Sequence, residues 1–148
     1  MILVDANILL YAYNAEAEQH AKSRAWLETA LSGADLVRFA WLTLWAFLRI
    51  ATSPRAFYRP LSASEAEAAI SSWLAQPAAG VIEPGERHWD ILRGLLSDAQ
   101  AKGPLVMDAV LAAIASRTRR RALHDRPRLR ACLEAQLDKP ADGGQLTS

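Results

Sequence analysis

The sequence predicts one α/β domain, a sandwich in which helices flank a short and mainly parallel sheet. Residues 2–5, ILVD, form an apolar run too short for a helix, which favours a fully buried parallel strand. Residues 81–84, VIEP, are a second candidate of the same kind. Helix-like segments follow each run, and this alternation is typical of folds with a parallel sheet. The length of 148 residues suits a single sizeable core.

Most of the chain between the two expected strands is predicted to be helical. Residues 7–13 indicate a short helical turn, and residues 18–31 predict an amphipathic helix that Ser32-Gly33 ends. Residues 41–51, WLTLWAFLRIA, are apolar nearly all round, which favours a helix buried between other elements. The inward positions expected on the amphipathic helix are Ala21, Ala25, Leu27 and Leu31.

A loop and a helix start are expected before the second strand. Residues 52–62, TSPRAFYRPLS, carry two prolines and predict the loop. Ser62 and Glu65 have the spacing of a capping box, in which each residue satisfies a backbone N–H near the other. We therefore expect a helix to begin there and to continue through Leu74.

Two more helices are expected after the second strand, over residues 86–101 and from Pro104 to about residue 117. Gly103 breaks the chain between them, and proline is favoured at the first position of a helix. We expect residues 1–115 to form the domain and residues 116–148 to be a basic, atypical and partly disordered segment.

Composition excludes several classes of protein. Hydrophobic content of 51% and charged content of 22% are near globular averages. No apolar run reaches the roughly 18–20 residues of a membrane span, and no basic segment precedes the first apolar run as in a signal peptide. The lone Cys132 excludes an internal disulfide or a cysteine zinc cluster. A cytoplasmic protein without a membrane partner is expected.

Charge is distributed unevenly along the chain. Residues 1–115 carry nine Lys and Arg against twelve Asp and Glu, a balance of −3, whereas residues 116–148 carry eight against four, a balance of +4. Seven of those eight are arginines between Arg117 and Arg130. The block could attract RNA phosphates or form a solvated, poorly folded tail, and composition favours the tail.

Two aspartates lie in apolar surroundings where an isolated charge is costly. Asp5 ends the first expected strand, and Asp108 lies within LVMDAVLAAIA. A buried ionised carboxylate is unfavourable by several kcal/mol unless it is paired or bound to a cation. Each has a structural alternative, because Asp5 could cap the following turn and Asp108 could interact with a helix dipole. Asp5 is nevertheless expected at the carboxyl end of a parallel strand, where sites of α/β proteins form.

The segments DANILLYA and LVMDAVLAAIA resemble the first and third acidic motifs of the PIN-domain ribonucleases, and most of all those of the VapC toxins. The intervening FLRIATSPRAFYRPLS and ISSWLAQPAAGVIEPGERHWDILRGLL resemble the middle of that family almost throughout. The resemblance covers about residues 1–115.

This resemblance implies an endoribonuclease that depends on Mg²⁺ or Mn²⁺ and is the toxin of a type II toxin–antitoxin pair. It implies RNA as substrate, a VapB-type antitoxin as partner, and a homodimer. Asp5 and Asp108 would be the catalytic metal ligands, and Asn7 would orient Asp5 or a bound water. The donor chemistry agrees, because Mg²⁺ prefers oxygen ligands and often takes only one or two carboxylates.

Other candidate residues have weaker signals. Arg49 could pair with an acidic neighbour, or it could contact RNA phosphate or the antitoxin. The histidines His20, His88 and His124 have no metal-ligand spacing and are expected at the surface. The five tryptophans favour core or interface positions over base-stacking platforms; they are Trp26, Trp41, Trp45, Trp73 and Trp89.

The sequence departs from the family in two places. Many PIN domains carry a glutamate on the buried second helix, where this chain has Ala46 in WAFLRI. After LAAIA the family continues with a strand and a last acidic motif, whereas this chain continues SRTRRRALHDRPRLRACLEAQL and places only Asp125 near the expected acid. The C-terminal strand is therefore expected to be altered or missing. A catalytically weakened or dead PIN domain that binds antitoxin or RNA is the alternative function, and a basic-tail nucleic-acid binder is a third.

A shifted reading frame would explain the second departure. Permitted codons for Arg117 to Arg130, read one base later, encode EHGAALCTTDRDF, which resembles the missing family segment at the expected distance from Asp108. We hypothesise that the chain from about Ser116 onward is a frame-shifted end.

Overall fold

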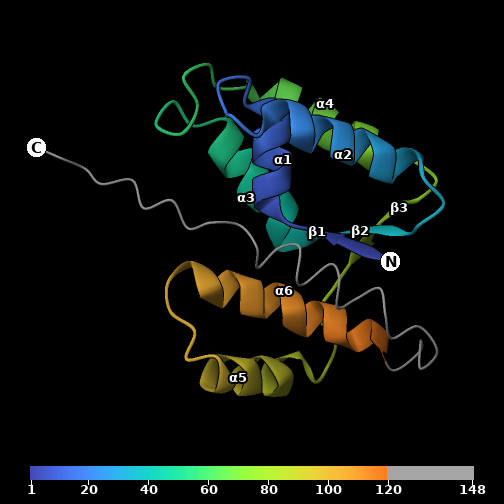
Figure 1. Ribbon diagram of the computed structural model, residues 1–148, viewed down its shortest axis with the longest axis vertical. Helices are drawn as coiled ribbons and strands as arrows, with labels where there is room; N and C mark the ends of the chain where they lie inside the picture. The colour runs from blue at the N-terminus through green and yellow to red at the C-terminus, as the bar shows by residue number, and fades with distance from the viewer. Residues whose placement is uncertain (120–148) are drawn as a thin grey trace, which may run out of the picture. The chain divides into compact units, whose positions relative to one another are not determined.

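A computed structural model describes residues 1–119 of the chain. These residues form a three-stranded sheet and six helices (Figure 1). The elements in chain order are β1 (Ile2–Val4), α1 (Ala6–Tyr13), α2 (His20–Ser32), β2 (Val37–Ala40), α3 (Trp41–Ala51), α4 (Ala63–Leu74), β3 (Ala79–Ile82), α5 (His88–Asp98) and α6 (Pro104–Arg119). Within this part of the chain, no helix has the length and apolar character needed to cross a membrane.

The sheet is parallel, with strand order β1-β2-β3. Val4 pairs with Phe39, and Ala40 pairs with Ile82, so the carboxyl ends of all three strands meet at one edge. The predicted α/β class and parallel sheet are confirmed. The expected strand at residues 81–84 lies slightly earlier, at Ala79–Ile82.

The central strand, β2, is an element that the sequence analysis did not predict. Arg38 interrupts its apolar run, and α3 begins at the next residue after the strand, so no turn residue separates the two. The guanidinium of Arg38 donates hydrogen bonds to the carbonyl oxygens of Val37 and Ala78, at 2.9 and 3.3 Å. A polar side chain is therefore accommodated in the middle strand because backbone acceptors satisfy it.

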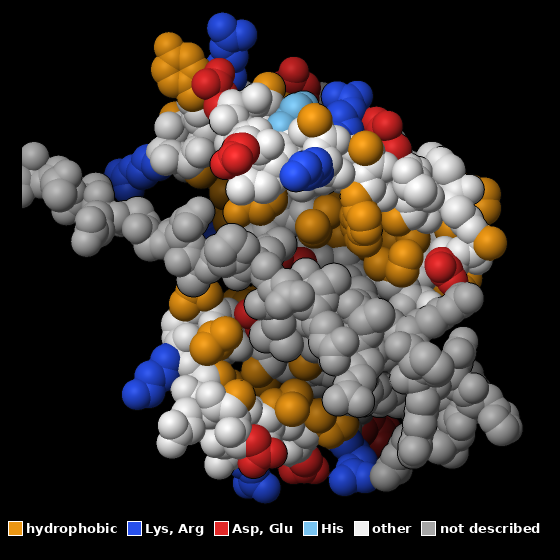
Figure 2. All heavy atoms as spheres, viewed as in Figure 1, with side chains coloured by type: hydrophobic (Ala, Val, Ile, Leu, Met, Phe, Trp, Pro, Cys, Tyr) orange, Lys and Arg blue, Asp and Glu red, His pale blue; other side chains and the backbone are white. Residues whose placement is uncertain are grey.

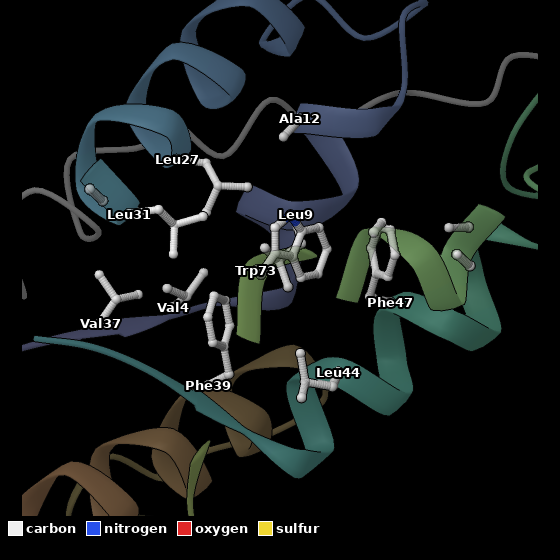
Figure 3. Packing of buried hydrophobic residues seen from close by; sticks show 14 of the residues in the cluster. Val4, Leu9, Ala12, Leu27, Leu31, Val37, Phe39, Leu44, Phe47 and Trp73 are labelled. Carbon is white, nitrogen blue, oxygen red and sulfur yellow. The ribbon is translucent and has the colours of Figure 1, made fainter. Parts of the chain in front are cut away.

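The core of the sheet and of helices α1 to α4 is centred on Trp73, whose side chain is 4% exposed (Figure 3). Its ring lies 4.8 Å from that of Phe47, 5.5 Å from that of Tyr13 and 5.9 Å from that of Phe39, measured between centroids. Leu9 of α1 packs into the same cluster. Helix α1 packs against α2 and α3, and α3 packs against α4.

The inward face of α2 differs from the prediction. Leu27 and Leu31 are buried as expected, but Ala21 and Ala25 are exposed. Ser23 and Ala30 are buried in their place, which gives the regular spacing of a helix stripe. Burial of an alanine removes little apolar surface from water, so the two leucines determine which side of the helix faces the core.

The boundaries of α3 match the prediction, but one side of the helix is exposed. The helix buries Thr43, Leu44, Phe47 and Ala51. Helix α3 packs against α1, α4 and β2, as expected of a helix buried between other elements, but Trp41 and Trp45 on its opposite side are 39% and 61% exposed. An apolar segment shows that its side chains are hydrophobic, but it does not show which face of the helix packs against another element.

Helix α4 begins at the predicted capping box, with both reciprocal hydrogen bonds between Ser62 and Glu65 present. Helix α5 is shorter than predicted, and a positive φ of 45° at Gln100 follows it. Helix α6 begins at Pro104, as expected.

Helices α5 and α6 share a hydrophobic cluster of their own, centred on Leu92, Ala109 and Ala113. The expected changes at residues 120–148, including the altered strand, lie outside the described residues.

Candidate active site

Asp5 lies at the junction of β1 and α1, at the carboxyl edge of the sheet. Its backbone is extended, with φ −85° and ψ 150°, and it occupies the position that precedes the first helical residue. Its side chain makes no capping hydrogen bond, so the alternative role as a helix cap is wrong. The half-buried carboxylate therefore remains available for another partner.

Asn7 restrains this carboxylate. Its side-chain Nδ2 donates a hydrogen bond of 3.1 Å to Oδ2 of Asp5. Asn7 is exposed and belongs to the first turn of α1, so the strand end and the helix start are joined through these two side chains. The remaining oxygen lone pairs of Asp5 are of the kind that a hard divalent cation takes.

Glu83 is an acidic residue at the same edge that the sequence analysis did not select. It follows β3 directly, as Asp5 follows β1, and parallel pairing brings the two strand ends to one edge of the sheet. Its Oε1 accepts a hydrogen bond of 3.2 Å from the indole Nε1 of Trp41, the residue after β2. The signal that could have identified Glu83 was its position at the end of the VIEP run.

Asp108 lies on α6 as the fifth residue of that helix, and it is exposed. The first turn of α6 contains no acidic residue, so the interpretation of Asp108 as a helix N-terminal carboxylate is wrong. The dipole effect is confined to the first turn. The convergence of Asp108 with Asp5 on one ion stays a prediction.

The donor set fits a cation that keeps most of its water. Among residues 1–119, no group of three or more His, Cys, Asp or Glu side chains is placed to hold a metal. Mg²⁺ in proteins is commonly held by one or two carboxylates and several waters, so a pair of aspartates is chemically sufficient. Asp5 would be one of these carboxylates, and Asn7 orients it.

Arg49 lies near the carboxyl end of α3 and is exposed. It forms no ion pair with any other residue in the described part of the chain; an ion pair does join Arg24 and Glu28. The interpretation of Arg49 as a structural partner of an acidic neighbour therefore has no support there. Ala46, which replaces the second-motif acid, is half-buried on the same helix.

The histidines differ from the simple surface placement that was expected. His20 is half-buried, and its Nδ1 lies 2.9 Å from the carbonyl oxygen of Tyr11. His88 is half-buried as well, and its Nδ1 is a buried atom without a hydrogen-bond partner. His124 lies outside the described residues. Of the five tryptophans, only Trp73 is a core residue.

Comparison with known proteins identifies the family of the chain. The family model of the PIN domain matches residues 2–126. The chain is 49% identical over 115 residues to Ribonuclease VapC37 of Mycobacterium tuberculosis. The aligned region covers 78% of this chain and 80% of the relative. It is 40% identical over 115 residues to VapC ribonuclease Mb2897 of Mycobacterium bovis, 78% of each. It is 38% identical over 113 residues to Ribonuclease VapC33 of Mycobacterium tuberculosis, 76% of this chain and 79% of the relative.

The family match spans most of the chain, and these relatives align over most of both lengths. The chain therefore belongs to the PIN-domain family, in the group of the VapC ribonucleases.

Proposed function

We propose that this protein is a metal-dependent endoribonuclease and the toxin of a type II toxin–antitoxin pair. The observation that carries the proposal is the Asp5 carboxylate, which lies at the carboxyl edge of a parallel sheet, is oriented by Asn7 and is not used to cap α1. Its relatives are named ribonucleases, which supports the reaction type. The proposed location is the cytoplasm, where cellular RNA is available as substrate.

Asp5 and Asp108 are the residues that would hold Mg²⁺ or Mn²⁺. The bound ion would supply Lewis-acid polarisation of the scissile phosphate and a more acidic water. Asn7 keeps the Asp5 carboxylate in one orientation through its 3.1 Å hydrogen bond. Arg49, a charged side chain without an ion-pair partner in the described residues, would bind an RNA phosphate.

The proposed partners are a VapB-type antitoxin and a second copy of the chain. Both come from the similarity to the VapC group. An antitoxin segment with a basic side chain would complement the carboxylates of Asp5 and Asp108 and block access of RNA to them. Light scattering of the purified protein, alone and with its antitoxin, measures both assemblies.

The test is a cleavage assay with the full chain, a panel of labelled RNAs, and Mg²⁺ or Mn²⁺. Asp5→Asn and Asp108→Asn should each abolish cleavage, and a chelator should do the same to the parent. The matched control is Asp35→Asn, an exposed aspartate just before β2 and therefore at the opposite edge of the sheet. Equal cleavage by the parent and both site variants would overturn the proposal.

A catalytically weakened or dead PIN domain is the alternative, and two observations favour it. Ala46 stands where many relatives of the fold carry an acid, and the described residues contain no group of three or more potential metal ligands. This alternative expects no cleavage under any metal condition, together with antitoxin binding that survives Asp5→Asn. A titration of the antitoxin against both proteins separates the two functions.

A further inference from the structure

One side of α3 carries an exposed row of two aromatic rings and a guanidinium. Trp41, Trp45 and Arg49 are four residues apart, so they are neighbours along the same side of the helix. Trp41 is 39% exposed and Trp45 is 61% exposed, and Arg49 is exposed as well. We name this set the α3 stripe. A tryptophan that leaves most of its ring in water needs an explanation, because its burial would be favourable.

The two indoles of the α3 stripe form a stack. Their ring centroids are 6.1 Å apart and their planes differ by 21°. Trp41 is fixed at the sheet edge by the hydrogen bond from its Nε1 to Glu83 at the end of β3. The stack therefore begins at the edge that also holds Asp5, and the more exposed ring of Trp45 lies one helical turn further along.

The charge of this region differs from that of the rest of the domain. Residues 36–64 contain four arginines and no Asp or Glu, although residues 1–115 as a whole are acidic. Arg38 is used within the sheet, whereas Arg49, Arg55 and Arg59 are exposed and form no ion pair within residues 1–119. Tyr58, in the same loop as the last two, is 83% exposed.

Figure 2 shows hydrophobic and basic side chains at the upper left, with an acidic side chain beside them. Figure 1 places the loop from α3 to α4 at that corner. The stripe and the loop supply planar rings and cations and contain no Asp or Glu of their own, although the carboxylate of Glu83 contacts Trp41 at the sheet edge.

We propose that the α3 stripe binds a single-stranded segment of RNA, with an unpaired base stacked on Trp45 and a phosphate on Arg49. The proposal rests on the proposed function and deepens it, because it states how the substrate is held beside the sheet edge. Every base has a face that can stack on an aromatic ring, so such contacts tolerate many sequences. Paired bases do not expose those faces, so duplex RNA is excluded.

Charge distinguishes this occupant from a protein partner. Tryptophan and arginine are also enriched at protein–protein interfaces. Three arginines without ion-pair partners among residues 1–119 would, however, be costly to bury there unless the partner supplied acidic side chains. A nucleic-acid strand instead supplies both planar bases and phosphates. The bases can stack on the indole rings of the stripe, and the phosphates can bind its guanidinium. The loop with Arg55 and Arg59 continues the cationic path for further phosphates.

The experiment measures binding without cleavage. The full chain is titrated, in the presence of a chelator, into a fluorescent single-stranded RNA of about 12 nucleotides, within the usual range of such sites. Trp45→Ala should weaken binding about five- to a hundredfold, the usual effect of losing one stacked base. Trp89→Ala is the matched control, because Trp89 on α5 is 62% exposed against 61% for Trp45. It should bind RNA like the parent.

Two more variants separate stacking from charge. Trp45→Phe should retain most of the affinity, because a phenyl ring still stacks, and it also guards against a folding defect in the alanine variant. Arg49→Gln should weaken binding and reduce the slope of log affinity against log salt by about 1. A duplex of the same sequence should bind more weakly to the parent and should not distinguish Trp45→Ala from Trp89→Ala.

The outcomes are distinct from those of the cleavage test. Equal single-strand affinity for Trp45→Ala and Trp89→Ala would overturn the proposal. If Trp45→Ala instead lowered the mass in light scattering while RNA affinity stayed constant, the stripe would be a protein interface and the proposal would also fail. Asp5→Asn should leave this binding intact, so failure of the nuclease proposal is visible separately.

Discussion

The side-chain amide of Asn7 donates a 3.1 Å hydrogen bond to the carboxylate of Asp5. Asp5 lies between β1, which ends at Val4, and α1, which begins at Ala6. Asp5 has extended backbone dihedrals, and Asn7 already belongs to the helix. Because the bond connects two rigid elements, it limits the rotamers of the carboxylate. We regard Asn7 as a positioning residue for the proposed metal ligand.

Replacement of Asn7 by alanine should lower the proposed RNA cleavage and raise the Mg²⁺ concentration that gives half-maximal activity. Loss of a side chain that orients a metal ligand typically costs about 10- to 100-fold in affinity or activity. Initial rates over a series of Mg²⁺ concentrations measure both effects, and the shift in metal dependence distinguishes positioning from a general loss of structure.

Asn14→Ala is the control for this variant, because the Oδ1 of Asn14 accepts a hydrogen bond from the backbone of Glu16 away from the sheet edge. It should leave cleavage and metal dependence unchanged. An Asn7→Ala protein with the metal profile of the parent would show that Asp5 needs no orienting partner.

Trp73→Ala should destabilise the protein by about 3–5 kcal/mol, since it removes a large side chain from a packed core. Trp73 is 4% exposed and contacts the rings of Tyr13, Phe39 and Phe47. Urea denaturation followed by circular dichroism measures the free energy of unfolding. Trp89→Ala, at a side chain that is 62% exposed, should change it by no more than about 0.5 kcal/mol.

Ser62→Ala should destabilise α4 by about 0.5–2 kcal/mol, because it removes the N-cap acceptor. The Ser62 hydroxyl accepts the backbone N–H of Glu65 at 3.1 Å. Ser64→Ala, two residues later and exposed, is the control and should be nearly neutral. Thermal unfolding of the three proteins provides the comparison, and equal midpoints for both variants would contradict the importance of the cap.

Glu65 should make stability depend on pH in the acidic range. The backbone N–H of Ser62 donates to the Glu65 carboxylate at 2.7 Å and is the main cause of a folded-state pKa below the ordinary 4.5, with the Ser62 side chain as second cause. A lowered pKa means that the stabilisation is present above pH 4.5 and is lost as the pH falls through the folded-state value. The difference in unfolding free energy between the parent and Glu65→Gln should therefore shrink on acidification.

The codons of residues 116–130 should encode the family's last acidic motif in the next frame. Nucleotide sequencing of the gene tests this directly. Restoration of that frame should then raise the proposed nuclease activity, because it returns acidic ligands to the chain. Codons that cannot encode Thr-Asp-Arg-Asp in the shifted frame would end the hypothesis.

Local signals in the sequence determined much of this fold. The capping box of Ser62 and Glu65 and the start of α6 at Pro104 follow from interactions within a few residues. Such interactions are the same in any tertiary context, so a sequence pattern is enough to predict them. The position of Asp5 at a strand end was predictable because the apolar run before it is too short for a helix.

Tertiary structure alone decided the central strand, the inward face of α2 and the exposure of the tryptophans. The guanidinium of Arg38 in β2 donates to the carbonyl of Ala78, 40 residues away, in addition to that of its neighbour Val37. Trp41 is held at the sheet edge by Glu83, 42 residues away, which makes the stack with Trp45 an exposed surface feature. Strand pairing and burial depend on partners distant in sequence, and the periodicity of one segment carries no information about those partners.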